Sequence, residues 1–261
     1  MIRVGIGGWD FDEWKGAFYP SGLKKDQALH FASRQLTAIE VNGTFYRTQN
    51  EAVFQKWAAE TPDNFMFSLK AHRSATAKRQ IGETSESIDF FINSGVLALG
   101  DKLGPIVWQM PPHKKLDLAD MSAFVARLPQ ERGGRQLRHA LEVRHETFKD
   151  PAFVELAAKA GVGIVFADSD DYPAIPDPTA DFIYARLQRS EEDEATGYPA
   201  KGLDLWAKRA KEWEKGGTPD GLDLIGGGAV KAKARDVFVY FIAGAKVRNP
   251  AAAQALIAKL K

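Results

Sequence analysis

Residues 141–148, LEVRHETF, bring an acid, a base and an imidazole together within a few positions. The first half alternates apolar and polar side chains as a β-strand does, so Glu142 and Arg144 point to the same face. His145 follows where this strand is expected to end. Because imidazole titrates near neutral pH, His145 is a candidate general base, with Glu142 as an acid or base beside it. The alternative is that His145 only caps the next segment or binds a carboxylate.

Other expected strands carry polar residues in the same alternating pattern. In a closed α/β barrel, alternate strand residues face the helices or the lumen, and catalytic groups gather at the carboxyl ends of the strands. The positions expected to face the helices are apolar: Ile39, Val41, Phe65, Phe67, Leu69, Leu141, Val143, Ile183, Ala185 and Leu187. The positions expected to face the lumen are polar: Glu40, Asn42, Lys70, Gln109, Glu142, Arg144, Asp168, Tyr184 and Arg186. Most of the polar set lies toward the ends of its strands, which predicts a site at one rim.

The elements that position these residues alternate along the chain. Strands are predicted over Arg3–Gly7, Thr37–Asn42, Phe65–Ala71, Pro105–Met110, 141–144, Gly163–Asp168, Asp181–Leu187 and Asp236–Ile242. Helices are predicted over Lys24–Gln35, Glu51–Glu60, Ser85–Leu99, Ala119–Leu128, Pro151–Ala160, Leu203–Lys215 and Ala251–Leu260. This order, without an obvious linker, predicts a single α/β domain over residues 1–261, a (β/α)8 TIM-barrel-like fold. An open doubly wound sheet is the alternative.

One connection does not fit the regular alternation of strand and helix. The proline-rich segment Tyr172–Pro178 leaves room for little more than a turn of helix. We therefore expect the barrel to be irregular around its sixth to eighth strands.

Opposite charges balance among the expected lumen residues: Glu40, Glu142 and Asp168 against Lys70, Arg144 and Arg186. An unpaired ion in a dry lumen costs several kcal/mol, so these side chains must pair whatever their role. One interpretation is an ion-pair network that only fills the barrel mouth. We favour a functional pocket, because the aromatic segment with Trp9 and Trp14, together with Tyr46, is expected to border the same mouth.

Composition narrows the classes of partner and cofactor. The chain has 35 basic and 34 acidic residues among 261, so its overall charge does not favour a nucleic acid as partner. It has no cysteine, which excludes disulfides, thiolate nucleophiles and cysteine metal sites. Its five histidines lack the close spacing of metal ligands, so we predict no metal site and no cofactor. The sequence does not exclude that a divalent metal binds.

The same sequence shows neither a signal-peptide pattern nor an apolar run of the roughly twenty residues that span a bilayer. We expect a cytoplasmic protein without a membrane partner.

Several longer stretches occur together in an order typical of one family. They are GIGGWDFDEWKGAFYP, AIEVNGTFYR, TPDNFMFSLKA, LGPIVWQMPP, LEVRHETF, FAD and IYARL. Over nearly its whole length the chain resembles the YecE-like family, also called domain of unknown function 72. The resemblance implies a TIM-barrel-like fold and no settled biochemical function.

Three loops depart from the pattern of that family. After the third strand the family tends to have a Thr-His pair, whereas Ser74–Gln80 reads SATAKRQ. After the seventh strand a His-Gly is usual, and this chain has Gln188-Arg189. The last strand commonly runs into an Asn-Asn-Asp-like sequence, but Phe241–Lys246 reads FIAGAK. The ligand and activity of this chain can therefore differ from those of other members.

These observations predict an enzyme that acts on a small polar, anionic molecule at the carboxyl rim of the barrel. Its acid and base side chains suit a hydrolase or a lyase, with Glu142, His145 and Glu40 as the expected catalytic residues. The expected substrate-binding residues are Asn42, Tyr46, Lys70, Gln109, Arg144, Asp168, Tyr184, Arg186, Trp9 and Trp14. The alternatives are a non-catalytic ligand-binding protein and, by analogy of fold, an endonuclease-like barrel that processes nucleic acid.

Overall fold

Eight parallel strands close into one barrel in the computed structural model, which describes residues 1–226 and 233–261. The bounds of the strands are Ile2–Gly7 (β1), Ala38–Val41 (β2), Met66–Lys70 (β3), Leu103–Gln109 (β4), His139–Glu142 (β7), Gly163–Asp168 (β8), Phe182–Leu187 (β9) and Asp236–Phe241 (β10). They lie side by side in this order, and β10 pairs with β1 to complete the circle. The predicted α/β barrel is confirmed, and the alternative of an open sheet is wrong.

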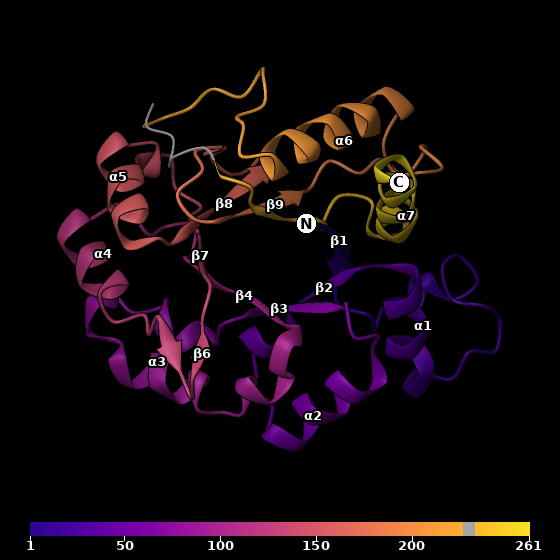
Figure 1. Ribbon diagram of the computed structural model, residues 1–261, viewed down its shortest axis with the longest axis horizontal. Coiled ribbons are helices and arrows are strands. Elements are labelled where there is room, and N and C mark those ends of the chain that lie inside the picture. The colour runs from indigo at the N-terminus through magenta and orange to yellow at the C-terminus, as the bar shows by residue number, and fades with distance from the viewer. Residues whose placement is uncertain (227–232) are drawn as a thin grey trace.

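Helices surround the strands on the outside of the barrel (Figure 1). Their bounds are Ala28–Gln35 (α1), Glu51–Glu60 (α2), Ser85–Ile92 (α3), Leu118–Val125 (α4), Pro151–Ala160 (α5), Ala200–Glu214 (α6) and Asn249–Leu260 (α7). The helix α5 shows why such bounds can be predicted. The Asp150 side chain accepts from Ala152 N, Pro151 takes the first turn, and Gly161 ends the helix with φ 64°.

The barrel is irregular where the proline-rich segment predicts it. Between β8 and β9 the described chain forms no helix. The expected helix over Ser85–Leu99 is wrong in its second half, because Gly95 adopts φ 115° and ends it. A Cβ at Gly95 would lie 2.6 Å from Glu51 N at the start of α2, so this close approach requires glycine. A 3-10 helix over Val96–Lys102 then leads into β4.

A small hairpin between α4 and β7 was not predicted. It pairs Glu131–Arg132 (β5) with Arg135–Gln136 (β6) in antiparallel fashion. The turn consists of Gly133 and Gly134, with φ 62° and 75°. Two glycines between short polar runs are the signal for such a turn, and the sequence contained it.

The two faces of the strands separate as the alternation predicts. All ten apolar positions expected to face the helices are buried in the core between barrel and helices. Inside the lumen, Phe182, Tyr184, Phe238 and Tyr240 pack together and close the barrel below its carboxyl end. Polar side chains fill the lumen above this aromatic layer. Among the described residues, none of the helices combines the length and apolar character that crossing a bilayer requires.

Candidate functional site

Arg186 joins two buried glutamates inside the barrel mouth. It lies one residue before the end of β9, whereas Glu40 lies in β2 and Glu142 ends β7. Arg186 Nη2 donates to Glu40 Oε1 at 3.2 Å, and Nη1 donates to Glu142 Oε1. These three residues are at most 3% exposed. Because β2, β7 and β9 are not neighbours in the barrel, the alternation along each strand brings the three side chains together across the lumen.

Arg144 extends this arrangement toward the rim. Its Nε and Nη2 donate to Glu142 Oε1 at 2.8 and 2.6 Å, and Nη2 also donates to Gln109 Oε1 at 2.6 Å. The guanidinium lies over the Tyr172 ring, 4.4 Å from its centre, and Nη1 donates to the Tyr172 hydroxyl at 3.3 Å. These contacts hold Arg144 in one orientation above the barrel.

Tyr184 completes the set from below. Its hydroxyl donates to Glu40 Oε2 at 2.7 Å. Burial raises the pKa of Tyr184 well above its usual value, and the neighbouring Glu40 raises it further, so the hydroxyl remains a donor. We call the connected side chains of Glu40, Gln109, Glu142, Arg144, Tyr184 and Arg186 the mouth network.

Glu142 accepts hydrogen bonds on only one of its carboxylate oxygens. Oε1 takes the bonds from Arg144 and Arg186, whereas Oε2 is buried and has no hydrogen-bond partner among the described residues. Burial would raise the pKa of Glu142, but Arg186, Lys70 and Arg144 outweigh it and hold the pKa below its usual value. Glu142 therefore stays ionised at neutral pH. A buried carboxylate oxygen without a donor costs free energy, so a donor brought in by a ligand would be stabilised there.

Lys70, the last residue of β3, is a buried cation with few polar contacts. Its Nζ lies 3.3 Å from Asn42 Oδ1 and 5.0 Å from the centre of the Phe45 ring. Within the described part of the chain it forms no ion pair. Burial lowers the pKa of Lys70; Glu142 opposes this shift, and Arg186 adds to it. This lysine is thus easier to deprotonate than an exposed one.

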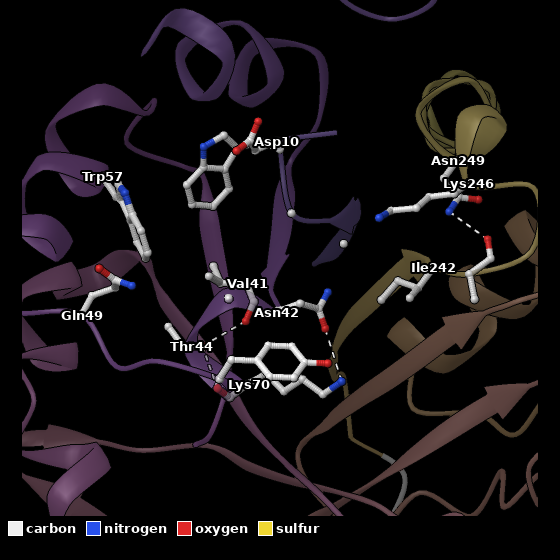
Figure 2. A pocket seen from close by; sticks show the side chains of 16 residues that line it. Asp10, Val41, Asn42, Thr44, Gln49, Trp57, Lys70, Ile242, Lys246 and Asn249 are labelled. Carbon is white, nitrogen blue, oxygen red and sulfur yellow. Dashed lines mark hydrogen bonds between the residues drawn. The ribbon is translucent and has the colours of Figure 1, made fainter. Parts of the chain in front are cut away.

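A cavity of about 520 Å³ opens beside Lys70 at the carboxyl ends of β1, β2, β3 and β10. Figure 2 shows Trp57 and Gln49 on one side and Lys246 and Asn249 on the other, with Lys70 between them. The aromatic wall consists of Trp57 and Trp9, whose ring centres lie 5.0 Å apart in an edge-to-face arrangement. This volume suits a small molecule.

The glycines that follow β1 let the chain approach this cavity closely. A Cβ at Gly7 would lie 2.9 Å from Asn42 Nδ2, so glycine leaves room for the Asn42 amide beside Lys70. Gly8 adopts φ 76° and its N donates to Glu40 O at 2.8 Å. The Gly-rich start of the chain therefore shapes the cavity wall.

The charges that line the cavity are not balanced. Lys246 extends over the Phe11 ring, 3.8 Å from its centre, and has no ion-pair partner in the described ranges. Asp10 also lines the cavity, but its carboxylate already binds Lys25 at 2.7 Å. Lys70 and Lys246 therefore leave a surplus of positive charge in the cavity, which favours an anion.

The comparison with known proteins gives the family. The family described as "Protein of unknown function DUF72" matches residues 3–261. The chain belongs to the DUF72 family. This confirms the resemblance seen in the sequence and leaves the biochemical function open.

Known DUF72 structures share the fold. A DUF72 family protein (TM1631) from Thermotoga maritima matches with a TM-score of 0.72 and 21% identity, over 98% of this chain and 97% of that one. A DUF72 family protein (EF0366) from Enterococcus faecalis matches with a TM-score of 0.74 and 16% identity, over 100% and 95%. The structure of SacUVDE matches with a TM-score of 0.54 and 8% identity, over 99% and 98%. At these identities, the likeness concerns the fold alone.

A sequence relative covers part of the chain. The UPF0759 protein YunF of Bacillus subtilis is 30% identical over 162 residues, which are 59% of this chain and 55% of that protein. The match thus spans about half the length of this relative.

Three residues predicted for the site, Asp168, Trp14 and His145, belong neither to the mouth network nor to the cavity lining. Asp168 shares its face of β8 with Phe166 of the outer core, and its carboxylate lies 3.6 Å from Arg189 Nε, so its expected lumen position is wrong. Trp14 is 1% exposed, and its Nε1 donates to Lys246 O at 2.9 Å, so it supports the cavity wall from behind.

His145 does not face the mouth network. Its Nδ1 accepts from Thr147 N at 3.2 Å and lies 3.0 Å from Thr147 Oγ1, capping the 3-10 helix Glu146–Phe148. The capping alternative from the sequence is the one observed. The hydrogen bonds of His145 therefore connect it to this 3-10 helix and not to the mouth network.

The remaining predicted residues fall into two adjoining groups. Glu40, Glu142, Arg144, Arg186, Gln109 and Tyr184 form the mouth network, whereas Trp9, Asn42, Tyr46 and Lys70 line the cavity. The sequence did not reveal three further lining residues: Trp57 on α2, Lys246 in the segment after β10, and Asn249 at the start of α7. Across residues 1–226 and 233–261, no three His, Asp or Glu side chains are grouped so as to hold a metal ion.

Proposed function

We propose that this DUF72 protein is an enzyme that binds a small anionic molecule in the cavity at the barrel mouth. The observation that carries the proposal is the pair of lysines, Lys70 and Lys246, which face the cavity without ion-pair partners among the described residues. A ligand carboxylate or phosphate would supply the missing charge. The edge-to-face pair of Trp9 and Trp57 would cover the apolar part of such a ligand.

The mouth network supplies the acid–base chemistry in this proposal. Glu142 is ionised, and its Oε2 is without a donor among the described residues, so this oxygen can accept a proton. Arg144 and Arg186 fix the position of its other oxygen. Glu142 Oε2 would take a proton from the ligand, and the cationic Arg186 would stabilise the negative charge left on the ligand.

A ligand screen with matched variants tests the proposal. Thermal shifts with small carboxylates and phosphate esters should reveal binders, because a hundredfold excess over Kd adds about 2.7 kcal/mol of stability. Lys246→Met should weaken the best binder about tenfold by removing a charged contact. Lys201→Met removes the same charge from the exposed start of α6, outside the cavity, and should leave Kd unchanged. Equal affinities in all three proteins would refute the proposed site.

Turnover separates the enzyme from the alternative of a non-catalytic binding protein. Mass spectrometry of the best ligand after incubation should show conversion by the wild type. Glu142→Gln should abolish conversion while the thermal shift with the ligand persists. Binding without conversion in the wild type would favour the non-catalytic alternative.

A nucleic acid is the second candidate ligand, and the rim of the cavity favours it. Tyr46 is 67% exposed with Arg73 5.9 Å from its ring centre, and Phe90 is 56% exposed beside the His72 ring. Exposed aromatic and basic side chains of this kind can stack on unpaired bases. Binding of a single-stranded oligonucleotide that falls steeply with salt, and falls again in Tyr46→Ala, would support this candidate.

A further inference from the structure

The geometry points to an imine-forming site: we propose that Lys70 Nζ attacks the carbonyl carbon of a small anionic aldehyde or ketone bound in the cavity. This inference rests on the proposed function and names its substrate class. Three observations support it. Lys70 faces the cavity, its ammonium has fewer hydrogen bonds than that of Lys102 outside the cavity, and the mouth network balances its own charges.

Lys70 is the one buried lysine among the residues that the structure describes, and it has fewer hydrogen bonds than the half-buried Lys102. Lys102 Nζ donates to Ala58 O and Thr61 O, both at 2.6 Å. Lys70 Nζ has only the longer contact with Asn42 Oδ1, at 3.3 Å, and faces the cavity. Figure 2 shows this contact, with Lys70 and Asn42 between the two cavity walls. An amine nucleophile needs such freedom, because its lone pair must point at the reacting carbon.

Burial favours the neutral amine of Lys70, whereas the charges around it act on its pKa in both directions. The mouth network contains two glutamates and two arginines, so its formal charges cancel without a contribution from Lys70. Burial is the main cause that lowers the pKa of Lys70; Arg186 and Arg144 lower it further, whereas Glu142 and Glu40 raise it. Desolvation and neighbouring cations are the conditions that turn a lysine into a nucleophile at neutral pH.

The step balances with groups at the site. The Lys70 nitrogen lone pair forms a bond to the carbonyl carbon, and the carbonyl oxygen takes up one proton to give a carbinolamine. A second proton lets this oxygen leave as water while the C=N bond forms. The amine supplies both protons that leave in the water, so the overall step consumes no other acid or base. Primary amine and carbonyl therefore give imine and water, with no change in oxidation state.

Lys246, on the other wall of the cavity, would orient the anionic group of the substrate. Lys246 faces Lys70 from the segment after β10, and its ammonium is already held over the Phe11 ring. A carboxylate or phosphate bound by Lys246 would leave the carbonyl group toward Lys70. The substrate class is therefore a carbonyl compound with an anionic group near the carbonyl, such as a 2-oxo acid.

Reductive trapping tests this inference. The full-length protein is incubated with pyruvate or glyoxylate and sodium cyanoborohydride, whose hydride reduces an imine to a stable secondary amine. Intact mass and peptide mapping should show a single dominant adduct on Lys70, and its yield should rise with pH as the amine deprotonates. Lys70→Met should lose this adduct, whereas Lys102→Met, a control at a half-buried lysine outside the cavity, should keep it. Lys246→Met should reduce trapping of pyruvate but not of the neutral ketone acetone.

The outcomes separate this inference from the proposed function. An adduct spread over exposed lysines, or unchanged in Lys70→Met, would overturn the imine. A thermal shift with pyruvate that depends on Lys246, without an adduct on Lys70, would also overturn it and leave anion binding intact. Trapping of acetone at Lys70 without binding of any anion would support the reactive lysine and refute the anionic substrate.

Discussion

Lys70, buried at the barrel mouth, and Lys114, half-buried between β4 and α4, have very different surroundings. Lys114 Nζ binds Asp120 Oδ2 at 2.6 Å and also donates to Arg79 O at 2.6 Å. Asp120 in turn accepts from Gly82 N at 2.8 Å, so its carboxylate is held from both sides. Lys70 has one long contact to an amide oxygen.

The hydrogen bonds of buried polar atoms can also be compared between the outer shell and the lumen. Outside the barrel, buried His139 accepts from Trp108 Nε1 at 3.0 Å, and its Nε2 lies 2.7 Å from Pro129 O. Both ring nitrogens are thus satisfied. Inside the mouth, Glu142 Oε2 and Arg186 Nε are buried without hydrogen-bond partners among the described residues. Trp213 Nε1 in the outer shell also lacks a partner among the described residues, so missing hydrogen bonds are not confined to the mouth. At the mouth, however, both unpartnered atoms belong to one connected pair of charged side chains.

The largest effect should come from removing the cation of the mouth network. Arg186→Met leaves Glu40 and Glu142 buried without their shared partner, and should lower the free energy of unfolding by about 3–5 kcal/mol. Urea unfolding monitored by tryptophan fluorescence measures this change. A loss below about 1 kcal/mol would mean that the two glutamates are not held by Arg186.

Acid should weaken the outer shell through His139. Burial lowers the pKa of His139 to about 4, whereas an unfolded histidine titrates near 6.5. The unfolded state therefore takes up a proton first, so stability falls as the pH drops below about 6.5 and has lost about 3 kcal/mol near pH 4.

Urea unfolding at pH 7, 5.5 and 4.5 measures this loss in the wild type and in His139→Gln. The variant should show a shallower decline, because the other histidines titrate in both proteins. Identical pH profiles would show that His139 is not the group responsible.

Breaking the satisfied lysine pair should have an intermediate effect. Lys114→Met removes one partner of Asp120, but the bonds from Gly82 N and Ile81 N remain. We expect a loss of about 2 kcal/mol in the free energy of unfolding, measured in the same urea assay.

The matching substitution at the mouth should be the mildest. Lys70→Met removes a desolvated cation without an ion-pair partner in the described chain, and should change stability by less than about 1 kcal/mol, in the stabilising direction. A loss as large as that of Lys114→Met would break the comparison, because it would show that Lys70 stabilises the fold as Lys114 does. Since the folded pKa of Lys70 is lowered, the advantage of the variant should shrink as the pH rises toward about 10.5.

Alternation along the strands made much of this architecture predictable. Glu40, Glu142 and Arg186 come from distant parts of the sequence, yet a period of two and barrel closure were enough to predict that they meet. Asp168 is the exception, because it lies two residues after Phe166 on β8, whose apolar side chain faces the helices, and alternation therefore places Asp168 on the same outer face.

Loops carried no comparable periodicity, which explains the other errors. Trp14 belongs to an aromatic cluster that packs within its own loop, so its residue type could not separate a ligand contact from a core contact. Lys246 lies in a segment that departs from the family pattern, and only the folded chain brings it to the cavity. Positions of this kind depend on tertiary packing and leave no local signal.

Segments from both ends of the described fold build the cavity: residues 7–10 follow the first strand, and residues 242–249 follow the last. During translation the early wall emerges long before the late one, and β1 lacks one neighbour until β10 is available to pair with it. A nascent chain still without β10 therefore has no complete pocket, so ligand occupancy can begin only once the ring of strands has closed. A ligand for this protein would consequently bind only the completely folded chain. Its binding would stabilise the closed barrel against separation of β1 from β10.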